Sequence, residues 1–333
     1  MKKTITLFIS LLAVMVSSAQ MNVLFVNDNG VYPPNTETVL STLNQTGHSI
    51  TVFDAVAENR SPELLEMQPY DLVVWYCGGD GVGRWFWNGT DSDNMQLKLY
   101  LEQGGRLWVM GTDLMYDRFG TPWIFQSGDF VYDYLGVAEY HAQSYGDDGS
   151  LGVPQLDLAP GIDWLTTNPI SWIYTTLWWV DAMVAAGGSA QVYMMGPQDY
   201  VLSNYASAIY KDNGSFQTLS FFFDPSLMDT EAHRLQLFSE VTTHFNNLVG
   251  ATEMMESTDH LFIFPNPASS FVHISSTKNE NESILLLDTQ GRVIRELSPA
   301  NEASSVVKLS LDGIAGGLYL IKSGTQSARL LVK

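Results

Sequence analysis

Cysteine and basic residues are scarce in this 333-residue chain. Its single cysteine, Cys77, cannot form an internal disulfide, so stability must come from a packed core, and 45% of the residues are hydrophobic. Lysine and arginine number 16 against 36 acidic residues, which gives a net charge of −20. Nucleic acid and anionic lipid require basic surfaces, so we expect neither as a partner. The acidity is also compatible with solubility alone.

Long hydrophobic runs are absent except at the N-terminus. Lys2 and Lys3 precede an apolar run over residues 5–16, and the small residues Ser17-Ser18-Ala19 follow it. This pattern is typical of a secretory signal peptide, predicted over residues 1–19, with the mature chain starting at Gln20. The run is short for a membrane span, and no other segment reaches the needed length. We therefore expect an exported protein without a transmembrane segment.

Residues 20–250 alternate between strand and helix patterns. Short apolar runs at 22–28, 49–55, 70–79 and 106–113 are separated by amphipathic segments. This order predicts an α/β domain with a flavodoxin-like parallel sheet covered by helices on both faces. From about residue 119 to 210 the regularity stops, and the composition favours a β-rich insertion. A strand near 216–225 and an amphipathic helix near 229–248 then close the predicted domain.

Residues 261–333 follow a polar linker at 251–260 and have another pattern. Short strand-like segments separated by turn residues predict a small antiparallel β-sandwich. Three blocks, "FPNPASSFVHI" (264–274), "LLLDTQGRVIREL" (285–297) and "LDGIAGGLYLIKSGTQSARLLVK" (311–333), are present. Together they resemble the type A C-terminal sorting domain of the type IX secretion system of Bacteroidetes. The resemblance implies export by that machinery, then surface attachment or release; the alternative is an ordinary ligand-binding β-sandwich.

The main domain resembles the class I glutamine amidotransferase-like fold. The segments that carry the resemblance are "NVLFVNDNG", "YDLVVWYCGG", "LKLYLEQGGRLWVMGTDLMYD", "GDFVYDYLGV" and "LSFFFDPSLMDTEAHRLQLFSEV". The resemblance implies a nucleophilic cysteine after the fourth strand, where this chain has Gly111-Thr112-Asp113. It also implies a histidine after the late strand, where Asp224-Pro225 stands. Both are missing, so we expect no amidotransferase or peptidase activity, and we predict that Cys77 is a buried residue at a strand end.

Polar residues follow several of the predicted strands. Ligands of parallel sheets bind beyond the carboxyl ends of the strands, which is where Asp28, Asp80, Asp113 and Asp224 would lie, with Asn29 beside them. Oxygen ligands of this kind suit Ca²⁺ or Mg²⁺, so these four aspartates are candidate metal ligands. The alternative is that they are helix caps and solvated strand ends.

Aromatic residues form a second candidate site. Trp85 and Trp87, and the later run with Trp172, Trp178 and Trp179, could stack on sugar rings, with Asp28, Asn29, Asp80 and Asp113 as polar ligand-binding partners. Alternatively, the aromatic residues fill the core. The sequence thus favours a secreted or cell-surface protein with a binding or surface-structural role, for example toward an extracellular glycan. The alternative function is a carbohydrate-active hydrolase that uses strand-end carboxylates.

Overall fold

The computed structural model describes most of the chain after residue 19. The described residues are 20–79, 84–87, 93–116, 118–252, 261–264, 266–276, 283–297, 306–324 and 326–333. The chain forms two compact units, residues 1–250 and 251–333. No helix in the described ranges combines the length and apolar character needed to cross a membrane.

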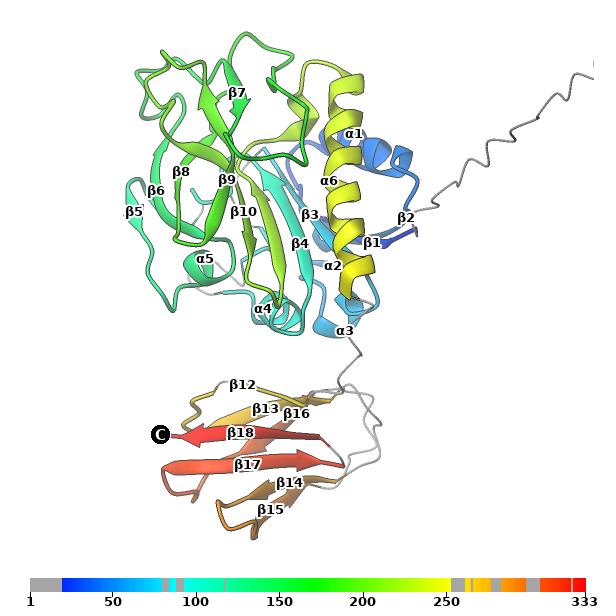
Figure 1. Ribbon diagram of the computed structural model, residues 1–333, viewed down its shortest axis with the longest axis vertical. Helices are drawn as coiled ribbons and strands as arrows, with labels where there is room; N and C mark the ends of the chain where they lie inside the picture. Colours follow the sequence, from blue (N-terminus) through cyan, green and yellow to red (C-terminus); the bar gives the residue numbers. More distant parts are fainter. Residues whose placement is uncertain are drawn as a thin grey trace, which may run out of the picture. The chain divides into compact units, whose positions relative to one another are not determined.

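The first unit is built on one 11-stranded sheet, and five of its strands run parallel (Figure 1). Their order is β2-β1-β3-β4-β11. Each is a short run of mostly apolar residues, and every residue of β3 is buried, as expected for a central parallel strand covered on both faces. The bounds are β1 Asn22–Asn27, β2 Ser49–Asp54, β3 Leu72–Gly78, β4 Arg106–Gly111 and β11 Gln217–Phe221.

The segment expected to be an insertion extends this same sheet. The main path continues from β11 through β10, β8, β6 and β5, all joined by antiparallel pairs, and β9 pairs with β10 and β7. The predicted α/β class is therefore confirmed, but the sheet is mixed rather than parallel throughout, because a short turn leads from β10 into β11 and makes this pair antiparallel. The bounds are β5 Trp123–Ile124, β6 Val137–Gln143, β7 Gln155–Leu158, β8 Asp181–Ala185, β9 Ser189–Gly196 and β10 Ala206–Asp212.

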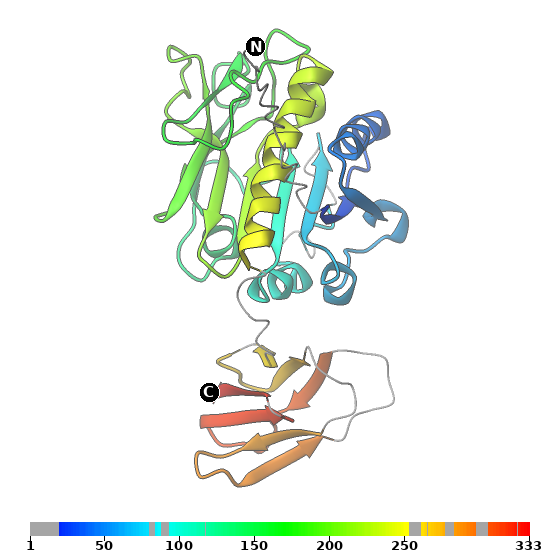
Figure 2. The same ribbon diagram turned by 45° about the vertical axis from the view of Figure 1, so that its right-hand side comes forward.

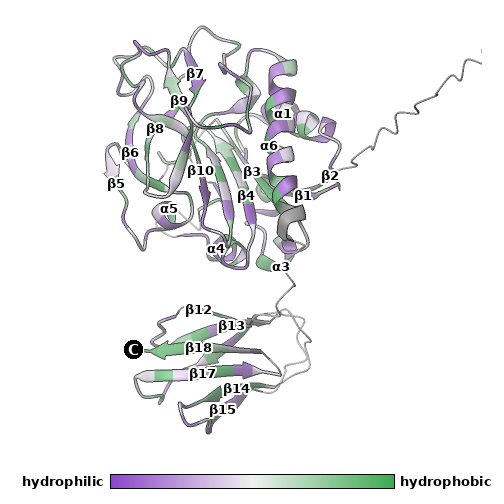
Figure 3. Cartoon of the chain, in the orientation of Figure 1, coloured by the Kyte–Doolittle hydropathy of each residue, from purple (hydrophilic) through white to green (hydrophobic). Residues whose placement is uncertain are grey.

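Two long helices, α1 (Pro33–Gln45) and α6 (Glu231–Thr252), cover one face of the parallel strands (Figures 1 and 2). Phe238 and Phe245 of α6 join a core with Tyr76 of β3 and Trp108 of β4. Hydrophobic and hydrophilic residues alternate around α6, as Figure 3 shows, because only one side of the helix faces the sheet. The shorter helices are α2 Ala55–Glu58, α3 Leu64–Met67, α4 Met95–Glu102, α5 Phe130–Asp133 and the 3-10 turn η1 Pro225–Leu227.

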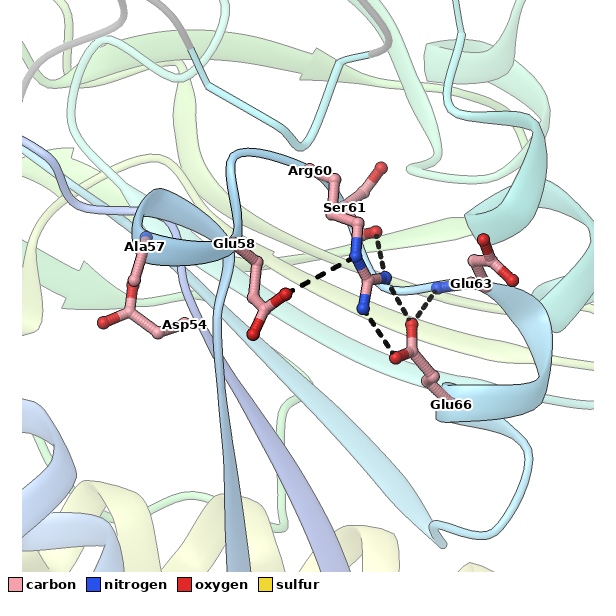
Figure 4. A network of polar contacts seen from close by, with 7 residues as sticks. All are labelled: Asp54, Ala57, Glu58, Arg60, Ser61, Glu63 and Glu66. Carbon is pink, nitrogen blue, oxygen red and sulfur yellow. Dashed lines mark hydrogen bonds and ion pairs between the residues drawn. The ribbon is translucent and has the colours of Figure 1, made fainter.

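An ion pair organises the connection between α2 and α3 (Figure 4). The Arg60 guanidinium donates to both carboxylate oxygens of Glu66, at 2.6 and 2.8 Å, and to the carbonyl of Ser61 at 3.2 Å. Glu66 also accepts the backbone N–H of Glu63 at 2.8 Å, which starts α3. Because Arg60 and Glu66 are partly exposed, the pair contributes little to global stability and mainly fixes the local turn.

The second unit is a small antiparallel structure of two sheets. One sheet has the order β12-β13-β16 and the other β15-β14-β17-β18. Side chains of both sheets, including Val272, Leu286 and Leu330, share one hydrophobic core, which gives the two-layer arrangement that alternating strands favour. The bounds are β12 Leu261–Phe264, β13 Phe271–Ser276, β14 Ile284–Leu287, β15 Val293–Leu297, β16 Val306–Ser310, β17 Gly317–Ser323 and β18 Gln326–Val332.

Candidate functional site

A cavity of about 570 Å³ lies at the carboxyl ends of the parallel strands. Its walls come from residues 31–35 after β1, Gly79 after β3, Thr112 after β4, Leu227 after β11 and residues 174–179 of the segment before β8. The strand order changes direction between β1 and β3. The connections that follow these two strands therefore leave toward opposite faces of the sheet, and a crevice opens between them. Among the described residues that line this cavity, none carries a charge.

Aromatic side chains dominate the wall of the cavity. Tyr32, Tyr174, Trp178 and Trp179 line it, and their exposed fractions are 58%, 61%, 46% and 38%. The ring of Tyr145 stacks on Trp178 with the ring centroids 4.2 Å apart. Contiguous exposed apolar surface of this kind often marks a ligand-binding groove or an interaction site. The wall therefore has the character of a stacking surface for a flat or ring-shaped ligand.

Unusual backbone conformations gather beside the same wall. Asp113, Tyr145 and Trp179 have φ angles of 54°, 70° and 63°, in the left-handed region that residues with a Cβ rarely occupy. The Asp113 N–H donates to the carbonyl of Trp179 at 3.1 Å, and the Trp179 N–H donates to the carbonyl of Ser144 at 3.2 Å. Such conformations persist where surrounding contacts hold them, and they concentrate at functional sites.

Asp28 is buried directly after β1 and is fully engaged by protein donors. One carboxylate oxygen accepts Trp75 Nε1 at 3.0 Å and the Phe86 N–H at 2.8 Å, and the other accepts the Trp85 N–H at 2.9 Å. Burial raises the pKa of Asp28 to about 6 despite these bonds. Asp28 therefore fixes the turn that carries Trp85, which is half-buried.

Asn29 is also buried, and it orders the next segment. Its Nδ2 donates to the Tyr32 carbonyl at 2.9 Å and to the Thr36 hydroxyl at 3.1 Å. Tyr32 lines the cavity, so Asn29 supports the wall from behind.

Asp224 is completely buried after β11. It accepts the Tyr76 hydroxyl at 3.0 Å, the Ser226 N–H at 2.8 Å and the Asn35 amide at 3.0 Å, and burial raises its pKa. Trp75 and Tyr76 are consecutive residues of β3 and point to opposite faces of the sheet. Because Asp28 bonds to Trp75 and Asp224 to Tyr76, the two carboxylates lie on opposite faces and do not form one site.

Asp113 lies on the turn after β4 and belongs to a polar cluster. Gln143 Nε2 donates to Asp113 Oδ1, to Asp181 Oδ1 at 3.1 Å and to the Tyr140 hydroxyl at 3.2 Å. Asp181 is fully buried, and burial followed by the charge of Asp113 raises its pKa to about 7. The sequence analysis identified Asp113 but not Asp181 or Gln143, because no motif marks the ends of β6 and β8.

The remaining expected ligands are placed as follows. Trp87 is completely buried, its Nε1 donates to the Leu114 carbonyl at 3.2 Å, and its ring packs on Phe86. It has no surface to offer a ligand, because the aromatic cluster around it fills the core. Asp80 lies outside the described residues. Within the described ranges, no three His, Cys, Asp or Glu side chains gather as a metal site, and the Ca²⁺ or Mg²⁺ hypothesis stays a prediction.

Cys77 is the second-last residue of β3 and lies in the core. Its side chain is buried, and burial raises the pKa of its thiol far above the ordinary value. Arg84 and Asp28 are the charged groups that act on the thiol. His141 of β6 pairs with Glu139 at 2.6 Å and stacks on Tyr205. The described surroundings of Cys77 therefore lack the base that a thiolate nucleophile needs.

Comparison with known proteins identifies the tail. Residues 262–333 match the family described as "Secretion system C-terminal sorting domain", so this part of the chain is a type IX sorting domain and indicates export. The chain also matches beta-agarase A of Zobellia galactanivorans, at 31% identity over 100 residues. That match covers 28% of this chain and 18% of the agarase, so the chain spans about a fifth of the length of this curated relative.

Solved structures resemble the chain only remotely. A putative ThuA-like protein from Bacteroides uniformis is 8% identical, with a TM-score of 0.43 over 69% of this chain and 94% of that one. PurLQS from Thermotoga maritima is 11% identical, with a TM-score of 0.42 over 69% of this chain and 100% of that one. At these values neither likeness carries an argument about fold or activity, which must come from the chain itself.

Proposed function

We propose that this is a secreted, cell-surface-directed protein whose α/β unit binds a carbohydrate in the aromatic cavity. The observation that carries the proposal is the uncharged wall of Tyr32, Tyr174, Trp178 and Trp179 at the carboxyl edge of the sheet. Flat aromatic faces pack on the apolar faces of sugar rings, and a few polar groups then fix the orientation of the ligand. The type IX sorting domain at 262–333 would deliver this unit to the cell exterior.

The polar groups of the cavity suit a neutral sugar. Asn35, Thr112, Thr175 and Thr176 line it with amide and hydroxyl groups, which can hydrogen-bond to sugar hydroxyls. The described lining residues are all uncharged, so with them an anionic or cationic ligand would lose its hydration without gaining an ion pair. A neutral oligosaccharide therefore fits the cavity better than a nucleotide, a phosphate or a charged peptide.

In this proposal, the amidotransferase-like unit does not catalyse reactions with a cysteine–histidine pair. Cys77 is buried, its pKa is raised, and the turn after β4 carries Asp113 in place of a thiol. The same proposal includes removal of residues 1–19 on export, so that secreted protein would begin at Gln20. N-terminal sequencing of protein recovered from the culture medium or cell surface tests this point.

Calorimetric titration with a panel of neutral oligosaccharides of four to six sugar units tests the binding role. In Trp178→Ala, loss of one stacking face should weaken binding about tenfold, which corresponds to ~1.4 kcal/mol. Trp123→Ala is the matched control, because Trp123 is equally exposed, at 48%, but lies on the edge strand β5 and does not line the cavity. Equal affinities of the two variants, or no binding by any member of the panel, would reject the proposal.

The alternative from the sequence, a carbohydrate-active hydrolase, depends on a carboxylate that can reach the ligand. Asp28 and Asp224 are buried with their oxygens occupied by protein donors. Asp113 is only half-buried and follows Thr112, a wall residue. Asp113 itself does not appear among the described lining residues, and its Oδ1 accepts from Gln143 Nε2, so the alternative has less support than binding.

A further inference from the structure

The segment that carries the two tryptophans of the cavity wall is held in place from behind. The Ser144 hydroxyl, directly after β6, donates to the Leu177 carbonyl at 3.1 Å and accepts the Val180 N–H at 3.0 Å. The Ser144 carbonyl accepts the Trp179 N–H at 3.2 Å, and Leu177 exchanges backbone hydrogen bonds of 2.8 and 2.9 Å with Val153. These bonds fix the backbone on both sides of the tryptophans before a ligand arrives, which lowers the entropic cost of binding.

Tyr145 sets the angle between the two indoles. Its ring stacks on Trp178, with centroids 4.2 Å and planes 26° apart, and it meets Trp179 edge-on, with centroids 5.2 Å and planes 74° apart. The two indole planes are therefore inclined to each other by at least 48°, the difference between 74° and 26°. Their centroids lie at most 9.4 Å apart, the sum of 4.2 and 5.2 Å, which neighbouring sugar units of one chain can span. Tyr145 itself does not line the cavity, so it supports the wall without meeting the ligand.

Gly152 holds the Trp178 indole from a second side. Its φ is +79°, and a Cβ at this position would lie 2.5 Å from Trp178 Cδ1 and 2.8 Å from Thr176 Oγ1. The indole thus packs against the backbone of Gly152 as well as against the ring of Tyr145. These two contacts leave it little freedom to turn toward the plane of Trp179, so the inclination of the two stacking faces is a fixed property of the wall.

Two inclined stacking faces select among glycans by the shape of the chain. A sugar ring that stacks on an indole lies roughly parallel to it, so rings on both tryptophans must be inclined to each other as the indoles are. In a β-1,4-linked ribbon such as a cellulose chain, successive rings alternate by a half turn and their planes stay nearly parallel. In β-1,3- and α-1,4-linked glucans, each linkage turns the chain, so the chain coils and successive rings are inclined. The wall therefore matches a coiled chain better than a ribbon.

We propose that the aromatic cavity binds a single coiled chain of a neutral glycan, with one sugar ring on Trp178 and a neighbouring ring on Trp179. This inference rests on the proposed carbohydrate binding and names the class of glycan. A ribbon can lay a ring flat against only one of the two indoles, so it gains one stacking contact where a coiled chain gains two. The cavity volume of about 570 Å³ suits a short segment of one chain, since small-ligand sites span roughly 300–1,000 Å³.

Calorimetric titration of the full chain with hexasaccharides of different linkage tests the inference. Laminarihexaose (β-1,3) and maltohexaose (α-1,4) represent coiled chains, and cellohexaose and mannohexaose (both β-1,4) represent ribbons. All four are neutral and equal in length, so they differ mainly in the inclination of successive rings. We expect the tighter-binding of the two coiled hexasaccharides to bind about tenfold more tightly than either ribbon, because a ribbon forgoes one of two stacking contacts.

Two variants of Tyr145 test its role as a positioning residue. Tyr145→Asn removes the supporting ring and tolerates the left-handed backbone at this position, where φ is 70°. Trp178 can then turn toward the plane of Trp179, so the preference for coiled chains over ribbons should fall from about tenfold to about threefold or less. Tyr145→Phe keeps the ring and is the matched control, which should retain the preference. A merely structural role of Tyr145 would weaken both classes of ligand alike, so an unchanged ratio in Tyr145→Asn would overturn this role.

The same titrations separate this inference from the proposed function. If the ribbons bind as tightly as the coiled chains, or more tightly, the inference about chain shape is overturned while carbohydrate binding stands. If none of the hexasaccharides binds, the proposed function fails as well. If coiled chains bind preferentially but Trp178→Ala and Trp179→Ala leave their affinity unchanged, the binding site lies elsewhere and both proposals are rejected.

Discussion

The buried carboxyl group of Asp181 should make the α/β unit less stable as the pH rises. Its pKa is 3.8 in an unfolded chain and about 7 in the folded one, because burial and Asp113 disfavour the charge. The folded state thus binds the proton more tightly, and this stabilising contribution is complete below pH 4 and is lost between about pH 4 and 7. Each tenfold difference in proton affinity is worth about 1.4 kcal/mol, so the loss approaches ~4 kcal/mol.

Asp181→Asn should remove this loss, because asparagine stays uncharged at every pH. We expect the wild type to lose more unfolding free energy than the variant between pH 4.5 and 8, and the variant to be the more stable protein at pH 8. Urea titrations followed by tryptophan fluorescence measure the α/β unit alone, since all nine tryptophans lie in it. Asp199→Asn controls for the change in net charge. Equal pH slopes for the wild type and Asp181→Asn would refute the reasoning.

Three further outcomes follow from the geometry. Gly78→Ala should lower the free energy of unfolding by at least ~2 kcal/mol, because φ of Gly78 is +76° and the new Cβ would lie 2.3 Å from Asn29 Oδ1. Gly47→Ala is the control in the same urea assay. Its φ is +84° but its surroundings are open, so it should lower the free energy of unfolding by only ~1 kcal/mol. Cys77 should not react with Ellman's reagent in the native protein and should react fully in guanidinium; native reactivity would contradict its burial. If the strand-end aspartates bind Ca²⁺, a Ca²⁺ concentration of 100 times the Kd should raise the free energy of unfolding by ~2.7 kcal/mol. EDTA or the substitution Asp113→Asn should remove this gain. A melting temperature that Ca²⁺ leaves unchanged would argue against the site.

The parallel part of the fold could be read from the sequence because its signals are local. Each strand from β1 to β4 is a continuous apolar run, and a helix pattern with its own stop signal follows nearly every one. The position of Cys77 at the end of β3 followed from the same runs. The rest of the sheet could not be predicted, because its strand pairs join residues that are far apart in the chain, such as Tyr140 and Met183. No periodicity in the sequence indicates these pairs.

The aromatic residues show a second limit. The runs at 85–87 and 178–179 both consist of aromatic residues, yet Trp87 is completely buried while Trp178 and Trp179 are exposed. What separates them is tertiary packing: Trp87 is enclosed by Phe86, Phe119 and Phe130. Among the described residues, no aromatic cluster of that kind encloses Trp178, whose stacking partner Tyr145 is itself only half-buried. A sequence reveals how much aromatic surface exists, but which part stays exposed depends on contacts between distant segments.

The polar residues at the strand ends support the site more than they line it. Asn29 holds Tyr32 and Asp224 holds Asn35, so these two act on the cavity through a wall residue, whereas Asp28 holds the turn of Trp85, which is not among the described wall residues. The parallel sheet brings its strand ends to one edge, but buried polar groups there must satisfy one another before they can serve a ligand. Asp113 differs in its left-handed backbone and in a carboxylate oxygen that accepts from Gln143 of β6, a strand distant in the chain. The described wall of the cavity is uncharged even in so acidic a protein, and the carboxylates of Asp28 and Asp224 are directed into the scaffold.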